Sequence, residues 1–223
     1  MSNAYYYANT TIDTRQGAFS IKLLDNIYTY TGFYLQNGGN VIINLNSFNI
    51  INEYQNYAMT FTGAANVTIL DTDERENFGA ISSKEYATII LSNGAKLTLA
   101  SGTISQPTGI CVHLASADTS FNLTEAGILQ GKTCIDSVDN ATINLLGGTI
   151  EATNVGVANG KVTISGGEFT APNRVITSKN VIFKGVEGKT ATINGPFGTN
   201  GVGAVFSDNT KVKYNGLRVD ELI

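Results

Sequence analysis

The sequence has little charge and few of the residues on which metal-bound or disulfide-bonded domains depend. Only 14% of its 223 residues are charged, with 14 Lys and Arg against 18 Asp and Glu, whereas about a quarter is usual for soluble domains. Such a mildly acidic chain lacks the basic surface of a nucleic-acid-binding protein, so no nucleic-acid partner is expected. One His and two Cys cannot form a disulfide framework or an ordinary zinc site.

Long hydrophobic runs and targeting features are also missing. No run of about 18 apolar residues is present, so we expect no membrane span. The N-terminus has no basic stretch followed by an apolar core, so we expect no signal peptide in this chain. The hydrophobic fraction of 42% is too high for a disordered protein, and the length suits one all-β domain.

The sequence does contain a short segment that is repeated. Each copy alternates apolar and polar residues, which predicts a strand with one buried face, and then reaches Gly or Gly-Gly and a further apolar residue. The copies are Asn66–Ile69, Lys96–Ile104, Ala141–Ile150 and Lys161–Phe169, with looser ones at Ser120–Ile128 and Asn180–Gly185. The residues expected to point inward first are Ile43, Val67, Leu97, Phe121, Ile143, Val162 and Val181, and those after the glycines are Ile104, Ile128, Ile150 and Phe169.

Each repeat carries another strand before the next copy begins. These strands are expected at 57–61, 87–91, 110–114, 133–137, 155–158 and 175–178, and polar corners such as Asn93-Gly94 and Asn159-Gly160 follow them. Asn and Gly tolerate the backbone angles of sharp corners. A unit of about 20 residues cannot bury its own apolar face and must stack on its copies. We therefore predict an all-β, single-stranded, right-handed parallel β-helix of seven to eight coils over residues 21–223, with 1–20 as an arm or cap; a β-sandwich is the alternative.

One stretch resembles a known group of proteins. Asn37–Ile50 (NGGNVIINLNSFNI) is similar to the segment that opens pectin-lyase-like right-handed β-helices of bacterial surface proteins, and the later VTISGGEF copy fits the same group. The resemblance extends over residues 20–215. It implies the coil architecture and leaves the activity open, because this fold includes lyases, hydrolases, adhesins and phage appendages.

The resemblance directs attention to acidic clusters, because polysaccharide lyases of this fold use Asp-bound calcium with a Lys or Arg base. The one dense cluster is Asp71-Thr-Asp73-Glu74-Arg75-Glu76, in the longest repeat. Asp71, Asp73 and Glu74 could bind calcium, and with Arg75 they could perform acid–base chemistry. The alternative is a solvated surface loop. No calcium or other cofactor is expected if that alternative holds.

A second candidate site follows from stacking the strands of two successive repeats. Alignment of 110–114 with 133–137 places His113 over Asp136 and Cys111 over Cys134. If all four side chains face outward, His113 and Asp136 form an acid–base couple and the two thiols could oxidise. A register shifted by one residue would bury all four instead.

Aromatic residues are concentrated in the first quarter of the chain. Tyr5, Tyr6 and Tyr7 are followed by Tyr28, Tyr30, Phe33, Tyr34, Phe48, Tyr54 and Tyr57. Aromatic faces could stack on sugar rings or form protein contacts. They could also cap the open end of the solenoid. Among them, Tyr5, Tyr6, Tyr7, Tyr28, Tyr30 and Tyr34 are the expected glycan or assembly contacts.

These observations favour a non-catalytic structural or adhesive protein, such as a phage fibre or decoration protein. We expect it in a virion or at a cell surface, as a homo-oligomer or bound to other virion or surface proteins or to polysaccharide. The alternatives are a bacterial cell-surface protein that binds glycans, and a polysaccharide lyase or hydrolase.

Overall fold

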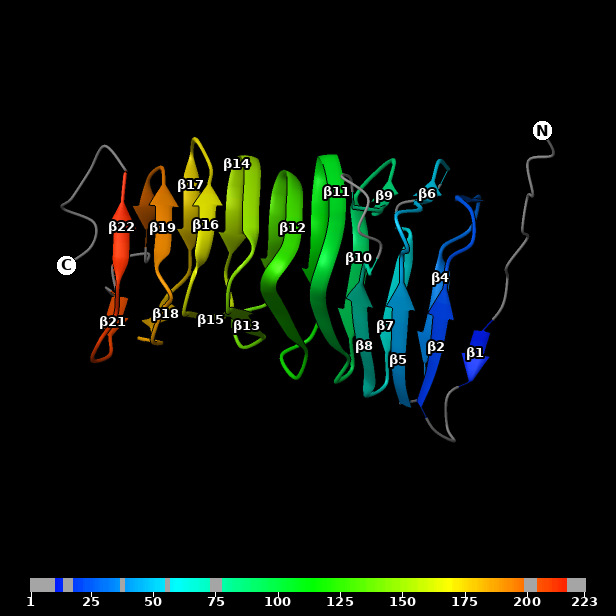
Figure 1. Ribbon diagram of the computed structural model, residues 1–223, viewed down its shortest axis with the longest axis horizontal. Helices are drawn as coiled ribbons and strands as arrows, with labels where there is room; N and C mark the ends of the chain where they lie inside the picture. The colour runs from blue at the N-terminus through cyan, green and yellow to red at the C-terminus, as the bar shows by residue number, and fades with distance from the viewer. Residues whose placement is uncertain are drawn as a thin grey trace.

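The computed structural model describes residues 11–13, 18–36, 39–54, 57–72, 78–198 and 204–215. Over these residues the chain forms strands and turns and no helix. All the pairings between strands of successive turns are parallel, and they stack into a β-solenoid of about eight turns. Figure 1 shows the turns side by side along one axis, with the chain advancing from β1 at one end to β22 at the other. The predicted all-β parallel solenoid is therefore confirmed.

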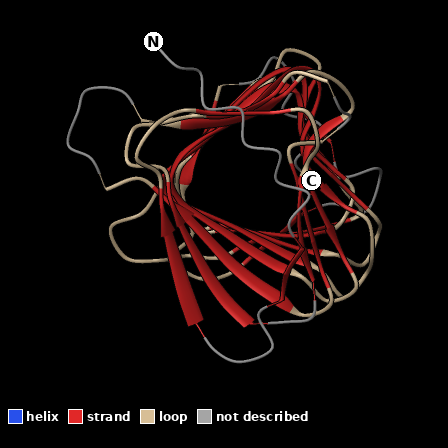
Figure 2. Cartoon of the chain, turned by 90° about the vertical axis from the view of Figure 1, so that its right-hand side faces the viewer, coloured by secondary structure: helices blue, strands red, loops and turns tan. Residues whose placement is uncertain are grey.

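Each turn contributes strands to three faces, which surround a common interior (Figure 2). Two long strands, β11 (Lys96–Leu114) and β12 (Ser120–Ser137), each bend through all three faces, and β14 (Thr149–Ala158) covers the second and third. The first face also contains β2 (Ala18–Lys22), β5 (Gly39–Asn44), β8 (Ala65–Leu70), β13 (Thr142–Leu145), β15 (Lys161–Ile164), β18 (Asn180–Phe183) and β21 (Ala204–Phe206). The second contains β3 (Ile27–Thr29), β6 (Ile50–Asn52), β9 (Ala80–Ser83), β16 (Gly167–Thr170), β19 (Ala191–Asn194) and β22 (Val212–Tyr214). The third contains β1 (Thr11–Asp13), β4 (Phe33–Gln36), β7 (Met59–Thr62), β10 (Ala87–Ser92), β17 (Arg174–Thr177) and β20 (Phe197–Gly198).

The core consists of columns of apolar side chains that continue from turn to turn. On the first face one inward column contains Val41, Val67, Leu97, Phe121, Ile143, Val162 and Val181, and all seven are at most 2% exposed. Inner side chains pack against those of the neighbouring turns as well as across the interior of their own turn, as Phe183 does on Phe197, so the stack is stable as a whole and not as separate units.

Two register predictions were wrong by a small amount. Ile43 also points inward, but it pairs with Ile69, and the partner of Val67 is Val41. Strict alternation cannot choose between these two positions, which face the same side. Leu129, not Ile128, pairs with Ile104 and Ile150. A β-bulge after Leu123 adds one residue to this turn and so moves the side chains of Ala126–Gly131 by one place relative to β11.

The outer surface of the first face explains the low charge. Its central column places Thr68, Thr98, Asn122, Asn144 and Thr163 in register. The amide of Asn144 donates to Oδ1 of Asn122 at 2.8 Å, and the amide of Asn122 donates to Oγ1 of Thr98 at 3.1 Å. Neutral polar side chains can hydrogen-bond to the equivalent side chain of the next turn, whereas like charges stacked in a column would repel one another.

Candidate functional site

The first sequence-derived pair comes together as predicted. His113 of β11 pairs in register with Asp136 of β12, and Nδ1 of His113 lies 3.0 Å from Oδ2 of Asp136. Both side chains point outward and are partly exposed, at 19% and 29%. The ring of Tyr86 meets the imidazole edge-on, with ring centroids 5.9 Å apart. In this arrangement Asp136 can orient the imidazole, and His113 can exchange a proton with a bound molecule.

The two thiols lie inside the solenoid, so neither of the predicted four-residue arrangements is right. Cys111 and Cys134 are fully buried and unoxidised, although His113 and Asp136 face outward. Strict alternation fails here because the strands turn a corner, where Cys111 and Val112, and likewise Cys134 and Ile135, are both buried. A hydrogen bond with Cys111, together with burial, raises the pKa of the Cys134 thiol well above its ordinary value. These cysteines therefore act as small core residues.

Asp71 holds the backbone of the corner between the first and second faces. It is 7% exposed. Its Oδ2 accepts hydrogen bonds from the amides of Ser47 at 3.0 Å and Gly79 at 2.6 Å, and its Oδ1 also accepts from Ser47 at 3.1 Å. Ser47 has a left-handed φ of 59°, so the carboxylate fixes a backbone turn that is otherwise unfavourable. These contacts give Asp71 a structural role.

The other candidates of the acidic cluster, Asp73 and Glu74 together with the basic Arg75, lie outside the described residues, as do Tyr5, Tyr6 and Tyr7. Within the part of the chain that the structure describes, no group of three or more His, Cys, Asp or Glu side chains could hold a metal ion. Because two of the three expected calcium ligands lie outside the described residues, calcium binding stays a prediction.

Tyrosine side chains gather at the corner between the second and third faces in the first three turns. Tyr30 follows β3, Tyr54 follows β6, and Tyr86 lies between β9 and β10. Their exposed fractions are 37%, 65% and 51%. The rings of Tyr30 and Tyr54 lie side by side, with centroids 4.5 Å apart and planes tilted by 41°. We call Tyr30, Tyr54 and Tyr86 the tyrosine corner.

An open groove of about 430 Å³ lies against the tyrosine corner. It is lined by Ile51–Tyr54 of the second turn and by Ser82–Lys84 of the third. Glu53 and Lys84 are exposed there, and each can hydrogen-bond to a ligand beside the ring of Tyr54. An aromatic face next to a carboxylate, an ammonium and a hydroxyl is suited to an amphipathic polar ligand such as a sugar.

A second groove of about 420 Å³ lies further along the same edge, where Ser105, Gln130, Glu151 and Thr170 take part in its lining. The two grooves are lined by residues of one continuous outward column on the second face. This column consists of Ile51, Ser82, Ser105, Gln130, Glu151 and Thr170. At about 4.8 Å per turn, this column is on the order of 24 Å long. An extended ligand could therefore follow the solenoid axis.

Sequence reasoning found only part of the tyrosine corner. Tyr28 and Tyr34 are exposed at 37% and 41%, but they stand on the second and third faces and not at the corner. Tyr54 was noted only as one of many aromatics, and Tyr86 was missed. Tyr54 follows the buried polar residue Asn52 by two positions, and Tyr86 follows the buried Ser83 by three. Aligning Asn52 with Ser83 in the sequence would have predicted that the two tyrosines lie at the same corner.

Comparison with known proteins gives no family for this chain. No protein-family model matches the sequence, and neither the curated proteins nor the solved structures contain a match. The described residues include no helix that is long and apolar enough to cross a membrane.

Proposed function

We propose that this protein is a non-catalytic adhesive β-solenoid that binds glycans at the tyrosine corner. The observation that carries the proposal is the position of Tyr54, which is 65% exposed, in contact with the tilted ring of Tyr30 and bordered by a polar groove. Exposed aromatic side chains that lie together beside a groove are typical of surfaces that bind a partner. A sugar ring presents an apolar face to the aromatic ring and hydroxyl groups to Glu53 and Lys84.

The setting that we propose is a virion appendage, such as a fibre or decoration protein, that contacts host surface glycans. The long, weakly charged rod and the similarity of Asn37–Ile50 to surface β-helices of the pectin-lyase-like type support this setting. A bacterial cell-surface protein that binds glycans would use the same corner. The gene neighbourhood distinguishes the two, since capsid genes beside this frame favour the virion.

A glycan array tests the binding function. The wild-type protein should bind a restricted set of glycans, and Tyr54→Ala should lose that signal while it keeps the β-rich circular dichroism spectrum of the wild type. Wild-type binding to no glycan, or unchanged binding by Tyr54→Ala, would reject the proposed site.

A polysaccharide lyase or hydrolase is the second candidate, because the His113–Asp136 pair has acid–base geometry. Incubation with uronate polysaccharides and calcium, followed by detection of unsaturated products, tests this candidate. Activity that His113→Ala abolishes would favour the enzyme over the adhesive protein.

A further inference from the structure

The two ends of the solenoid are not equivalent, and their shapes complement each other. At the N-terminal end, β1 lies on the third face alone, where it pairs with β4. At the C-terminal end, β21 and β22 follow the last complete turn on the first and second faces, where they pair with β18 and β19. Figure 1 shows β1 and β22 at opposite ends of the rod. The three end strands together would make one complete turn.

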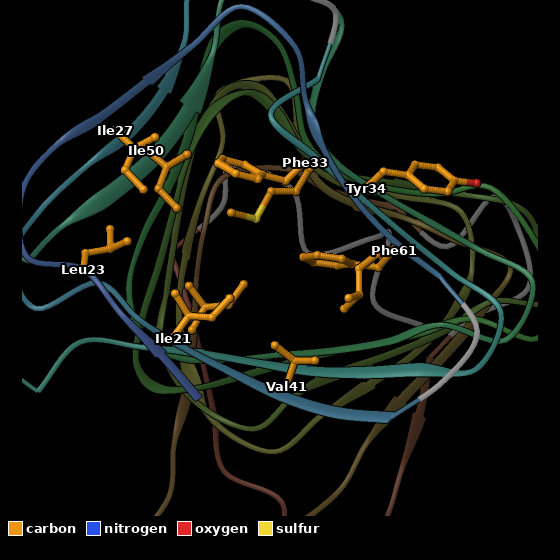
Figure 3. Close-up of a pocket in the computed structure, with 11 residues that line it drawn as sticks. Ile21, Leu23, Ile27, Phe33, Tyr34, Val41, Ile50 and Phe61 are labelled. Carbon is orange, nitrogen blue, oxygen red and sulfur yellow. The ribbon is translucent and has the colours of Figure 1, made fainter. Parts of the chain in front are cut away.

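The N-terminal end is apolar and hollow. Figure 3 shows a cavity there with Ile21, Ile27, Phe33 and Phe61 around it. The cavity has a volume of about 80 Å³ and its lining is entirely apolar. Ile21 and Ile27 belong to the first complete turn, and both side chains are only partly buried.

The C-terminal end carries aromatic side chains in the same columns. Phe206 continues the inward column that begins at Ile21. Tyr214 likewise continues the inward column that begins at Ile27. Phe206 stacks on Phe183 with centroids 4.8 Å apart, yet it remains 47% exposed. A second copy placed on this end in the same direction would set its Ile21 on Phe206 and its Ile27 on Tyr214.

The charges at the two ends also match in this arrangement. One outward column begins at Asn26 at the N-terminal end and ends at Lys213 at the C-terminal end. The exposed Asp25 directly precedes Asn26. The exposed Asp208 follows Ser207, which ends the column that begins at the exposed Lys22. Stacking thus brings Lys213 close to Asp25 of the next copy, and Asp208 close to its Lys22. Head-to-head stacking would reverse the strand direction and would bring like ends together.

From these three agreements we propose that copies of this chain associate head to tail, with the C-terminal end of one solenoid on the N-terminal end of the next. The composite turn consists of β21 and β22 from one copy and β1 from the next. This contact is heterologous, so it leaves a free end on each side and extends into filaments. At the N-terminal end the extra strand lies on the third face, and at the C-terminal end the extra strands lie on the first and second faces. Only one rotation of a copy on the next therefore lets these strands complete a turn. The inference does not depend on glycan binding.

Sedimentation velocity over a range of protein concentrations tests the proposal, with negative-stain electron microscopy of the largest species. The wild-type protein should form rods of increasing length and constant width. Phe206→Asp should weaken association by about tenfold or more, because it places a charge in a buried aromatic contact. Lys161→Asp, an exposed change on the first face away from both ends, is the matched control and should leave association unchanged.

A charge exchange separates the contact from effects on folding. Lys213→Asp and Asp25→Lys should each weaken association about two- to fivefold, and the combination of both should restore it. Because neither residue is in the core, a loss of fold cannot produce this recovery. A protein that sediments as a monomer at every concentration, or a closed oligomer that none of these end variants affects, would overturn the proposal.

Discussion

The imidazole of His113 lies directly over the carboxylate of Asp136, one turn away, with Nδ1 and Oδ2 3.0 Å apart. Both side chains are partly exposed, so water screens their attraction. We expect His113→Gln to change the free energy of unfolding by less than about 1 kcal/mol and to leave glycan binding intact. Urea denaturation followed by circular dichroism measures the first quantity. A loss of several-fold in glycan affinity would show instead that His113 takes part in the binding site.

Gln106 stabilises the corner between β9 and β10 through hydrogen bonds from its buried side chain. Its side chain is fully buried, and Nε2 donates to the carbonyl oxygens of Ser83 at 3.0 Å and Glu85 at 2.7 Å. Gln106→Leu removes both donors and should destabilise the protein by about 1–3 kcal/mol, because buried carbonyls lose their partners. Gln130→Leu, at an exposed position on the second face, is the control. Equal effects of the two substitutions on the urea midpoint would contradict this account.

Replacing Asp71 with Asn, a side chain of the same shape without the charge, should lower the free energy of unfolding. Asp71→Asn replaces a carboxylate that accepts from the amides of Ser47 and Gly79, and half of the new group is itself a donor. Loss of these charge-assisted bonds should cost about 1.5–3 kcal/mol in the free energy of unfolding. The exposed Asp208→Asn serves for comparison. If Asp71 instead bound calcium, added calcium would raise the melting temperature of the wild type but not of Asp71→Asn.

The buried thiols should make stability depend on pH in the alkaline range. The pKa of Cys134 is raised in the folded state by its hydrogen bond with Cys111 and by burial, above an ordinary value of 9.0. At a pH above 9 the unfolded chain therefore loses the thiol proton while the folded chain keeps it, so the free energy of unfolding falls as the pH rises. Below that pH the contribution is fully present.

Comparison of the wild type with Cys134→Ala isolates this effect, because the other titrating groups are common to both proteins. Between pH 8 and pH 10 the wild type should lose more stability than the variant. Parallel stability curves would show that Cys134 ionises equally in the folded and unfolded states.

The sequence predicts the coil architecture well because the physics that defines a coil is local. Alternation, Gly and Asn at corners and a repeated length are visible in segments such as Lys96–Ile104, and Asn93 and Asn159 do adopt left-handed angles. The same regularity placed His113 over Asp136. What failed were positions where the backbone departs from the regular pattern: the bulge before Leu129, and the corner that turns Cys111 and Cys134 inward.

The candidate site was harder to predict because it depends on corners, where sequence spacing does not determine position. Tyr30 and Tyr54 are 24 residues apart in the chain, but the rings meet because the corner between β3 and β4 stacks on that between β6 and β7. The same stacking brings Tyr86 close to His113. Such contacts emerge only when the register of each turn is known.

Calorimetric titration of the strongest array glycan into the wild type and into a Tyr30→Ala/Tyr54→Ala variant tests the central claim most directly. Phe78→Ala, which removes an aromatic ring of similar exposure that lies away from the tyrosine corner, is the matched control. We predict that the double variant binds at least about tenfold more weakly, while Phe78→Ala and the wild type have the same affinity. Equal affinity of the double variant and the wild type would contradict glycan binding at the tyrosine corner.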